Sequence, residues 1–265
     1  MRNTIQFLLA MTLLFGRMEA QLANPNALGV SMGHLHLNAK DPAAQKSFWV
    51  DYVGATPAKL GPLEVYRLPG VIVFVNQAQP SGHAAGGTEG SVINHVGLRV
   101  RDLKAYVAKA PAANVKIVAQ SDKQAMLLAP DDIRVELTLD EESSVPVAMH
   151  HIHFYVPDID AAKKWYASVF GAIPGMRGKF EAADLPGVNL SFSKAETALA
   201  GTKGRALDHF GFEVKELESF AKKLEGGGTK FDVSYRNVAK LGIAIAFFTD
   251  PWNTYIELTE GLVHK

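Results

Sequence analysis

The pattern of apolar and polar positions alternates with a period of two in many short stretches of the chain, which is typical of β-strands. Two of these stretches, residues 33–37 and 150–154, share a motif of two histidines separated by one residue. Because residues i and i+2 of a strand lie on the same face of a sheet, each motif places two imidazoles on one side. Two further alternating stretches, residues 93–100 and 207–214, each have a single histidine near their start.

A helical stretch follows each of these four strands, and short β-rich segments such as residues 71–75 follow the helices. Asp41 and Asp158 suit helix starts, because an aspartate can cap the free N–H groups of the first turn. Gly54 and Gly171 suit helix ends, where a left-handed backbone is common. This order of elements predicts an α+β fold made of four βαβββ modules.

Internal repetition divides the chain into two halves. Matching residues and segments recur at a constant offset of 117: Lys46 and Lys163, 54–57 and 171–174, 68–71 and 185–188. A colinear series at one offset indicates duplication of an ancestral unit. We therefore expect one domain over residues 30–142 and a second over residues 147–263, each with two modules that form one curved mixed sheet.

The first twenty residues have the features of an export signal. Arg2 precedes an apolar run from Ile5 to Phe15, and the small residue Ala20 offers a cleavage point. The run is shorter than the about 20 apolar residues that span a bilayer. We interpret residues 1–20 as a signal peptide, with an amphipathic or buried N-terminal helix as the alternative. A periplasmic or secreted protein without membrane contact is then expected after signal removal.

Composition excludes several classes of function. Lys plus Arg total 27, as do Asp plus Glu, and no long block of one charge stands out. A nucleic-acid-binding face needs such a basic block, so we expect no nucleic-acid partner. The chain has no cysteine, which excludes disulfides, thiolate metal ligands and a cysteine nucleophile. We expect a monomer or homodimer whose partner is a small molecule.

These motifs resemble the vicinal oxygen chelate superfamily, which includes glyoxalase I, bleomycin- and fosfomycin-resistance proteins, and extradiol dioxygenases. The resemblance rests on residues 151–158, 208–212 and 250–258, and it extends from about residue 33 to residue 262. It implies that histidines of the first strand of each module, with a glutamate of a last strand, bind a metal ion.

Two histidines and one carboxylate on one face of a sheet form a facial triad, which leaves about three positions open on an octahedral metal. Two such triads can be written: His151, His209 and Glu257, and His34, His95 and Glu136. If the first module pairs with the fourth, the two triads exchange histidines, and each still consists of two histidines and one glutamate. A lone strand histidine is more often structural, so the interpretation depends on the set of three occurring twice. The expected cofactors are one or two divalent ions of Zn, Mn, Ni or Fe.

His36 and His153 follow presumed ligands by two residues, so we expect them to face the same cavities. They are candidate catalytic acid/base groups or donors that orient a ligand, and the alternative is a cavity-lining histidine bonded to backbone. Tyr255 stands two residues before Glu257, although packing in the core is the more common role of a strand tyrosine. His150 precedes its strand and is expected to be peripheral.

Three subfamilies match the sequence only in part. The resemblance to glyoxalase I implies a further carboxylate ligand, but Phe74 and Ser191 lie near the matching positions. Extradiol dioxygenases imply a tyrosine where this chain has Phe247. Fosfomycin-resistance enzymes share the set of two histidines and a glutamate, but the sequence shows no convincing Lys/Arg cluster for a phosphonate.

We therefore predict a divalent-metal-dependent lyase, isomerase or dioxygenase-like enzyme that acts on a small oxygen-bearing molecule. The metal would stabilise negative charge on a bound oxygen. The alternative is a non-catalytic binding or resistance protein of the bleomycin-resistance type. Its ligand would lie in a cleft with Trp165, Phe180 and Trp252 as possible walls.

Overall fold

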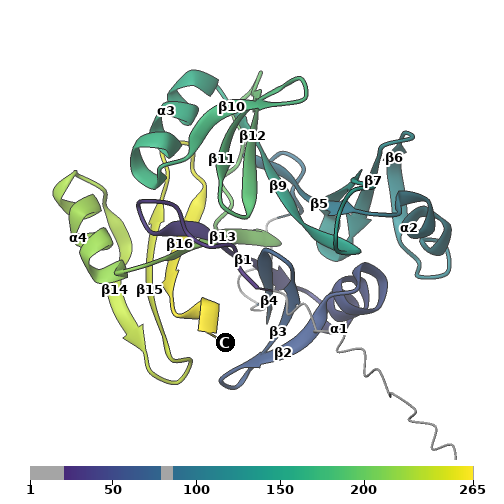
Figure 1. Ribbon diagram of the computed structural model, residues 1–265, viewed down its shortest axis with the longest axis horizontal. Helices are drawn as coiled ribbons and strands as arrows, with labels where there is room; N and C mark the ends of the chain where they lie inside the picture. The colour runs from purple at the N-terminus through teal and green to yellow at the C-terminus, as the bar shows by residue number, and fades with distance from the viewer. Residues whose placement is uncertain (1–20, 79–85, 265) are drawn as a thin grey trace, which may run out of the picture.

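The structure is a computed structural model that describes residues 21–78 and 86–264 (Figure 1). The signal peptide predicted for residues 1–20 lies outside the described residues. No helix in the described ranges is long and apolar enough to cross a membrane.

Four modules follow one another along the chain, as the sequence predicts. The first comprises β1 (Val30–Ala39), α1 (Pro42–Lys46), η1 (Ser47–Val53), β2 (Thr56–Leu60), β3 (Leu63–Leu68) and β4 (Val71–Gln77). The second comprises β5 (Ile93–Val100), α2 (Leu103–Lys109), β6 (Lys116–Gln120), β7 (Gln124–Ala129), η2 (Pro130–Asp132) and β8 (Ile133–Leu139). The third comprises β9 (Val147–Val156), α3 (Ile159–Phe170), β10 (Ile173–Arg177), β11 (Phe180–Leu185) and β12 (Val188–Lys194). The fourth comprises β13 (Leu207–Val214), α4 (Leu217–Gly226), β14 (Phe231–Val238), β15 (Ile243–Thr249) and β16 (Tyr255–Glu260), followed by η3 (Leu262–His264).

The helix boundaries follow the local chemistry of the sequence. The carboxylates of Asp41 and Asp158 each accept a 2.9 Å hydrogen bond from a backbone N–H in the first turn of α1 and α3. Gly54 and Gly171 end η1 and α3 with φ angles of 97° and 70°, a conformation that glycine adopts without strain. The predicted capping residues are therefore confirmed.

The modules pair in an order that differs from the expected one. One mixed sheet has the strand order β14-β15-β16-β13-β1-β4-β3-β2, and the other has the order β10-β11-β12-β9-β5-β8-β7-β6. The first module thus shares a sheet with the fourth (the 1–4 sheet), and the second shares one with the third (the 2–3 sheet). The α+β class and the two curved sheets are confirmed. The expected pairing within residues 30–142 and within residues 147–263 is wrong.

The antiparallel pairs β1–β13 and β5–β9 join the modules at the centre of each sheet. All four first strands have the same alternation, so the pattern does not determine which strand is the neighbour. The connection between modules does: only seven residues, 140–146, separate β8 from β9, which brings the second and third modules together.

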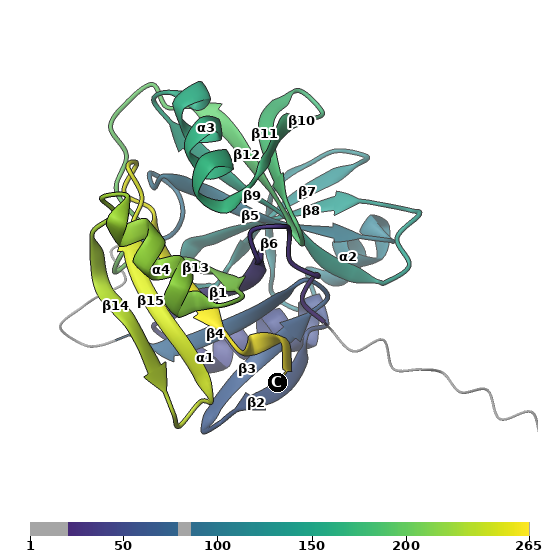
Figure 2. The same ribbon diagram turned by 60° about the vertical axis from the view of Figure 1, so that its left-hand side comes forward.

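Each central strand has one face in the core and one face that carries histidines. Leu35 and Leu37 of β1 are fully buried in a core between the two sheets, while His34 and His36 lie on the opposite face. Across this core the rings of Phe154 and Phe210, from different sheets, lie 5.9 Å apart. Each long helix packs on its own module, α3 on β10–β12 and α4 on β14–β16 (Figure 2).

The histidine face of the 1–4 sheet is closed. The β2–β3 turn touches the β14–β15 turn: a Cβ on Gly61 would lie 2.4 Å from the backbone oxygen of Lys240 (Figures 1 and 2). A second apolar cluster fills the space beneath this contact: Leu22, Leu60, Val65, Ile72, Phe74, Ile243, Ile245 and Leu262. The 2–3 sheet differs, because a Cβ on Gly178 in its β10–β11 turn would meet nothing within 4 Å.

Candidate metal centres

The structure gathers the predicted ligands into two clusters, one on each sheet. Site A consists of His34, His209 and Glu257, with His36 beside them. Site B consists of His95, His151 and Glu136, with His153 beside them. The predicted groupings of His34 with His95 and of His151 with His209 are therefore wrong. The alternative that follows from pairing the first module with the fourth is the arrangement observed.

Site A lies where β1, β13 and β16 are adjacent. Nε2 of His34 and Nε2 of His209 lie 2.8 and 3.0 Å from the same oxygen of Glu257. The three residues are buried, with exposed fractions of 1%, 4% and 7%. A Cβ on Gly211 would lie 2.0 Å from the His34 ring, so the ring reaches Glu257 only because the neighbouring strand has a glycine there.

A buried charge network sets the ionisation of site A. The carboxylate of Asp208 accepts a 2.5 Å hydrogen bond from Nδ1 of His209. Burial opposes the imidazolium form of His209, but hydrogen bonds and negative charge from Asp208 and Glu257 outweigh it and raise its pKa. Burial also opposes the carboxylate form of Glu257, but the electrostatic interaction with His34 and hydrogen bonds from both histidines lower its pKa. A metal ion that binds here must displace the Nε2 protons that His34 and His209 donate to Glu257.

Site B has the same ligand types with wider spacing. Nε2 of His95 lies 3.1 Å from Nε2 of His151, and these atoms lie 3.7 and 3.5 Å from the carboxylate oxygens of Glu136. Donor atoms bound about 2.1 Å from one ion lie about 3.0 to 3.5 Å apart in octahedral or tetrahedral geometry. The two longer separations exceed hydrogen-bond length. The spacing of these three residues fits a shared cation.

Hydrogen bonds behind the ligands allow both imidazoles of site B to present lone pairs. Nδ1 of His95 donates to the side-chain oxygen of Asn94 at 2.8 Å, which leaves its Nε2 unprotonated. Nδ1 of His151 lies 3.1 Å from Nδ1 of His150, so it can hold its proton there and free its Nε2. Burial lowers the pKa of His95 to about 3 and that of His151 well below its usual value. Protons therefore do not compete for these nitrogens at neutral pH.

His150 is one residue that the sequence interpretation misjudged. The register of β9 against β5 pairs His151 with Gly97 and Met149 with Leu98, so His150 is the extra residue of a β-bulge. The bulge brings it beside His151 instead of leaving it peripheral. Its counterpart in β1 is Gly33, and among the described residues Nδ1 of His34 is buried without a partner.

His36 and His153 face the two sites, as expected for residues two positions from a ligand. Nε2 of His36 accepts a 2.7 Å hydrogen bond from the amide of Asn76, and Nε2 of His153 lies 2.8 Å from Oγ of Ser193. Burial lowers the pKa of His36 to about 3 and that of His153 to about 4. Both side chains are therefore neutral near pH 7.

Arg177 is the second feature that the sequence interpretation missed. It lies on β10, its Nε donates to Oγ of Ser191 at 2.6 Å, and its Nη1 lies 4.0 Å from Oε1 of Glu136. Its guanidinium also lies over the ring of Phe180. In sequence it is one of two basic residues, with Lys179, in a hairpin. Its position beside site B depends on the pairing of the second and third modules.

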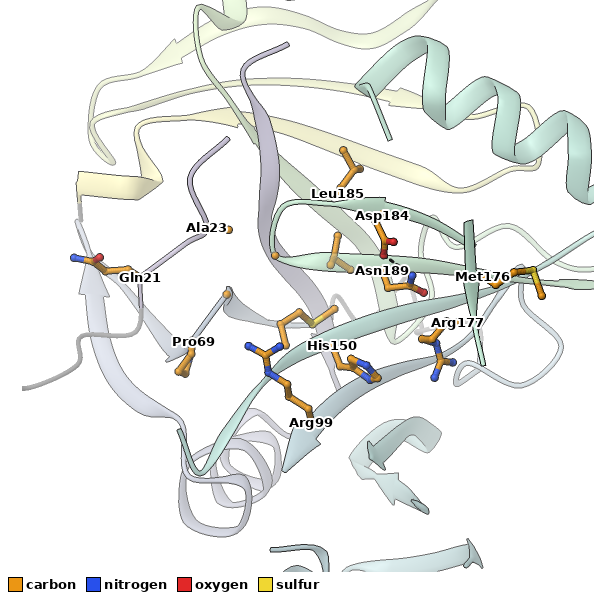
Figure 3. A pocket seen from close by; sticks show the side chains of 14 residues that line it. Gln21, Ala23, Pro69, Arg99, His150, Met176, Arg177, Asp184, Leu185 and Asn189 are labelled. Atoms are coloured by element: carbon orange, nitrogen blue, oxygen red, sulfur yellow. Dashed lines mark hydrogen bonds between the residues drawn. The ribbon is translucent and has the colours of Figure 1, made fainter. Parts of the chain in front are cut away.

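A pocket of about 570 Å³ has on its wall His150 and Arg177, which neighbour His151 and Glu136 of site B (Figure 3). Arg99, His150 and Arg177 are on its wall, and Asp184 and Asn189 form a 2.6 Å hydrogen bond on another part of the wall. The remaining lining residues are mostly apolar or small: Gln21, Ala23, Pro69, Gly70, Met149, Met176, Leu185, Gly187 and Val188. This volume is in the range of small-molecule binding sites.

The aromatic walls proposed for the alternative function do not lie together. Trp165 and Trp252 contact each other, with ring centroids 5.9 Å apart, and pack against the core. Phe180 instead packs edge-on against His153 at site B, with ring centroids 4.7 Å apart. Tyr255 packs against Phe247 and is largely buried, which is the common role of a strand tyrosine.

The ligands, the sheets and the repeated modules agree with one family. The model of the Glyoxalase/Bleomycin resistance protein/Dioxygenase superfamily matches residues 148–258. Residues 148–258 belong to that superfamily. The resemblance recognised in the sequence is thereby confirmed, and the superfamily fold extends over both sheets. No curated protein matches the chain in sequence.

Solved structures of this superfamily fold include relatives that match along most of the chain. Glyoxalase I from Zea mays is 15% identical with a TM-score of 0.70, and the match covers 87% of this chain and 92% of that chain. A mutant of the same enzyme is 14% identical with a TM-score of 0.70, covering 88% and 94%. A putative dioxygenase from Bacillus subtilis is 13% identical with a TM-score of 0.62, covering 92% and 88%. These likenesses establish the fold.

Proposed function

We propose that the protein is a divalent-metal-dependent enzyme, of the lyase, isomerase or dioxygenase-like kind, that acts at site B on a small oxygen-bearing molecule. The observation that carries this proposal is the convergence of two neutral imidazoles and one carboxylate beside an open pocket. Their donor atoms lie 3.1 to 3.7 Å apart, close to the about 3.0 to 3.5 Å between ligand atoms of one ion. Zn, Mn, Ni and Fe all suit this donor set.

A divalent ion at site B would supply a Lewis acid that stabilises negative charge on a substrate oxygen. The surrounding side chains position the ligands: the carboxylate of Glu136 accepts hydrogen bonds from Gln124 and Thr138 at 3.1 and 3.0 Å. His153 can accept a proton from the substrate. In the tautomer whose Nε2–H donates to Oγ of Ser193, Nδ1 keeps a lone pair, and this atom is buried without a partner among the described residues.

For site A we propose a structural role. Its ligand types are the same, but the contact between the β2–β3 and β14–β15 turns and the apolar cluster below it leave little space for a substrate. A metal ion there would link β1, β13 and β16 across the two terminal modules and would stabilise the folded state.

Metal analysis of matched variants tests this proposal. The variants are His95→Ala in site B and His209→Ala in site A, at equivalent positions of the two sheets. After refolding with Zn, Mn, Ni and Fe separately, the native protein should bind one or two ions, measured by elemental analysis. His95→Ala should remove the site B ion and abolish catalysis, which can be screened with small hydroxylated, carbonyl and catecholic compounds.

A double variant, His95→Ala with His209→Ala, that keeps the native metal content would disprove the proposal. A protein that binds its ligand equally well before and after chelation would instead be a binding protein of the bleomycin-resistance type. Export to the periplasm or medium is a separate proposal, tested by fractionation of cells that express the chain with and without residues 1–20.

A further inference from the structure

Arg177 carries a positive charge that the surrounding residues neutralise only in part. Its side chain is 15% exposed, and its Nη2 is buried without a hydrogen-bond partner among the described residues. The nearest carboxylate is Glu136, at 4.0 Å from Nη1. In the proposed function Glu136 is a metal ligand, so its negative charge would be shared with a divalent ion. A buried guanidinium with a free N–H group then favours an anionic partner.

The guanidinium is held in one orientation. Its Nε donates to Oγ of Ser191, and that hydroxyl donates to the side-chain oxygen of Asn189 at 2.6 Å. Asn189 in turn donates to Asp184. Stacking over Phe180 supports the other side of the group. In this orientation Nη2 of Arg177 has no hydrogen-bond partner among the described residues, and Nη1 is 4.0 Å from Glu136. A carboxylate is the anion that matches such an edge with two parallel hydrogen bonds.

The distances connect this anion with the metal ligands. Because Nη1 of Arg177 lies 4.0 Å from Oε1 of Glu136, an anion bound by Arg177 would lie next to the position of the ion. A substrate oxygen on the carbon next to the substrate carboxylate would then reach the position of the ion. The pocket of about 570 Å³ is much larger than a two-carbon acid, and its Met149, Leu185 and Val188 offer apolar contacts for a longer tail.

We infer that the substrate of site B is a carboxylic acid with an oxygen on the neighbouring carbon, a 2-hydroxy or 2-oxo acid with an apolar tail, whose carboxylate is bound by Arg177. This inference rests on the proposed function, because the second oxygen would bind the metal ion. Phosphate is a poorer match, because Arg99, the other arginine that lines the pocket, is paired with Asp140 at 3.9 Å.

Binding of matched probes to the zinc-loaded protein tests the inference by calorimetry. The acids are glycolate, lactate and 3-phenyllactate, and the matched neutral probe is 3-phenylpropane-1,2-diol, in which CH₂OH replaces the carboxylate. The native protein should bind 3-phenyllactate at least about tenfold more tightly than the diol, because a charge-assisted hydrogen bond is lost. Phenyllactate should also bind more tightly than lactate.

Arg177→Gln should weaken phenyllactate binding by about tenfold to a hundredfold and leave the diol unchanged. Arg177→Lys should recover part of the loss, and the control Arg101→Gln should change the affinity by less than about threefold, because Arg101 is exposed and is not among the residues that line the pocket. Equal binding of acid and diol to the native protein would overturn the inference without any variant. So would preferential binding of inorganic phosphate, or no binding of any of the three acids at millimolar concentration.

The metal content of each variant separates this inference from the proposed function. If Arg177→Gln keeps its zinc and its affinity for phenyllactate, the carboxylate inference is wrong and the metal enzyme remains. If the double variant His95→Ala with His209→Ala keeps its zinc, the proposed function is wrong, whatever Arg177 binds.

Discussion

Sites A and B have the same ligand types on equivalent strands, and they differ in everything that surrounds the ligands. In site A the histidines are hydrogen-bonded to a single carboxylate oxygen and Asp208 lies behind His209. In site B the ligands are spread apart and a neutral amide, Asn94, lies behind His95. In site A the histidines and the carboxylate bind one another, whereas in site B the Nε2 lone pairs of the histidines are available to a metal ion. The ligand triad alone therefore does not determine what a site does.

The same contrast extends to the positions around the ligands. Leu60 and Phe74 near site A correspond to Arg177 and Ser191 near site B at the repeat offset of 117. Leu60 and Phe74 belong to the apolar cluster, whereas Arg177 and Ser191 are hydrogen-bonded to each other. Duplication preserved the ligands, and divergence of their neighbours closed one cavity and made the other polar.

The largest expected difference between the sites is the loss in free energy of unfolding when one histidine is replaced by alanine. His34→Ala leaves the buried Glu257 carboxylate with fewer partners, so it should lower the free energy of unfolding by about 3 kcal/mol or more. His151→Ala removes a neutral imidazole and should cost less, about 1 to 2 kcal/mol. Urea unfolding in the presence of a chelator measures both. Equal losses would contradict the description of site A as an ion pair.

The two sheets should also differ in how their stability depends on pH, because the 1–4 sheet has a buried carboxylate, Glu213. Its carboxylate accepts backbone hydrogen bonds of 2.8 and 3.0 Å from Gly261 and Leu262, which hold the C-terminal segment against site A's sheet. The equivalent position near site B is Arg99. Burial raises the pKa of Glu213 from 4.5 to about 7. The folded state therefore binds this proton more tightly, and the resulting stability is full below about pH 4.5 and is lost as the pH rises through 7.

Urea unfolding at pH 5 and pH 8 tests this sign. Between pH 5 and pH 8 the free energy of unfolding of the native protein should fall by about 2 kcal/mol more than that of Glu213→Gln, whose amide does not titrate. Arg99→Gln is the matched control and should keep the native pH dependence. A variant Glu213→Gln that follows the native curve would show that Glu213 does not titrate in this range.

An exchange of the residues behind the ligands should exchange metal affinity. A carboxylate behind a ligating histidine makes the imidazole a stronger donor, and losing such a partner reduces metal affinity by about 10- to 100-fold. Asp208→Asn should therefore weaken zinc binding at site A, and Asn94→Asp should strengthen it at site B. Competition with a chromophoric chelator gives both constants, with His95→Ala or His209→Ala used to isolate one site. No change in either variant would mean that these neighbours do not tune the ligands.

The smallest expected effect concerns the contact between the β2–β3 and β14–β15 turns that closes site A. Gly61 and Gly178 occupy equivalent turns with φ angles of 56° and 58°, so alanine introduces similar backbone strain in both. Gly61→Ala also forces a Cβ against Lys240, and it should be less stable than Gly178→Ala by about 1 kcal/mol or more. Thermal unfolding of the two variants measures the difference. If Gly178→Ala is the less stable, the closed turn contact does not exist in solution.

Local features of this fold were predictable from the sequence, because they depend on neighbouring residues. Helix caps at Asp41 and Asp158 follow from side chains that bond the adjacent backbone. The candidate ligands follow from period-two alternation and from the repeat. The alternation alone did not predict the grouping of those ligands, because either antiparallel partner would bury the same faces. The seven-residue link from residue 140 to residue 146 was the available signal.

The roles of Arg177 and His150 depend on tertiary structure. Arg177 reaches Glu136 across the junction of two modules, so its sequence neighbours do not show it. His150 reaches His151 because of a bulge, and a bulge shifts the strict alternation on which a strand prediction relies.

The nested pairing of modules has a consequence for how the chain reaches its native state. The 2–3 sheet is formed by one continuous segment, residues 93–194, whereas the 1–4 sheet requires both ends of the chain. Contacts between distant segments form slowly, because a long loop must close first. We expect β5–β9 to gain protection early in pulse-labelling hydrogen exchange and β1–β13 to follow. In this order of folding, site B assembles before site A. Removal of the first or the fourth module would leave the 1–4 sheet without half of its strands.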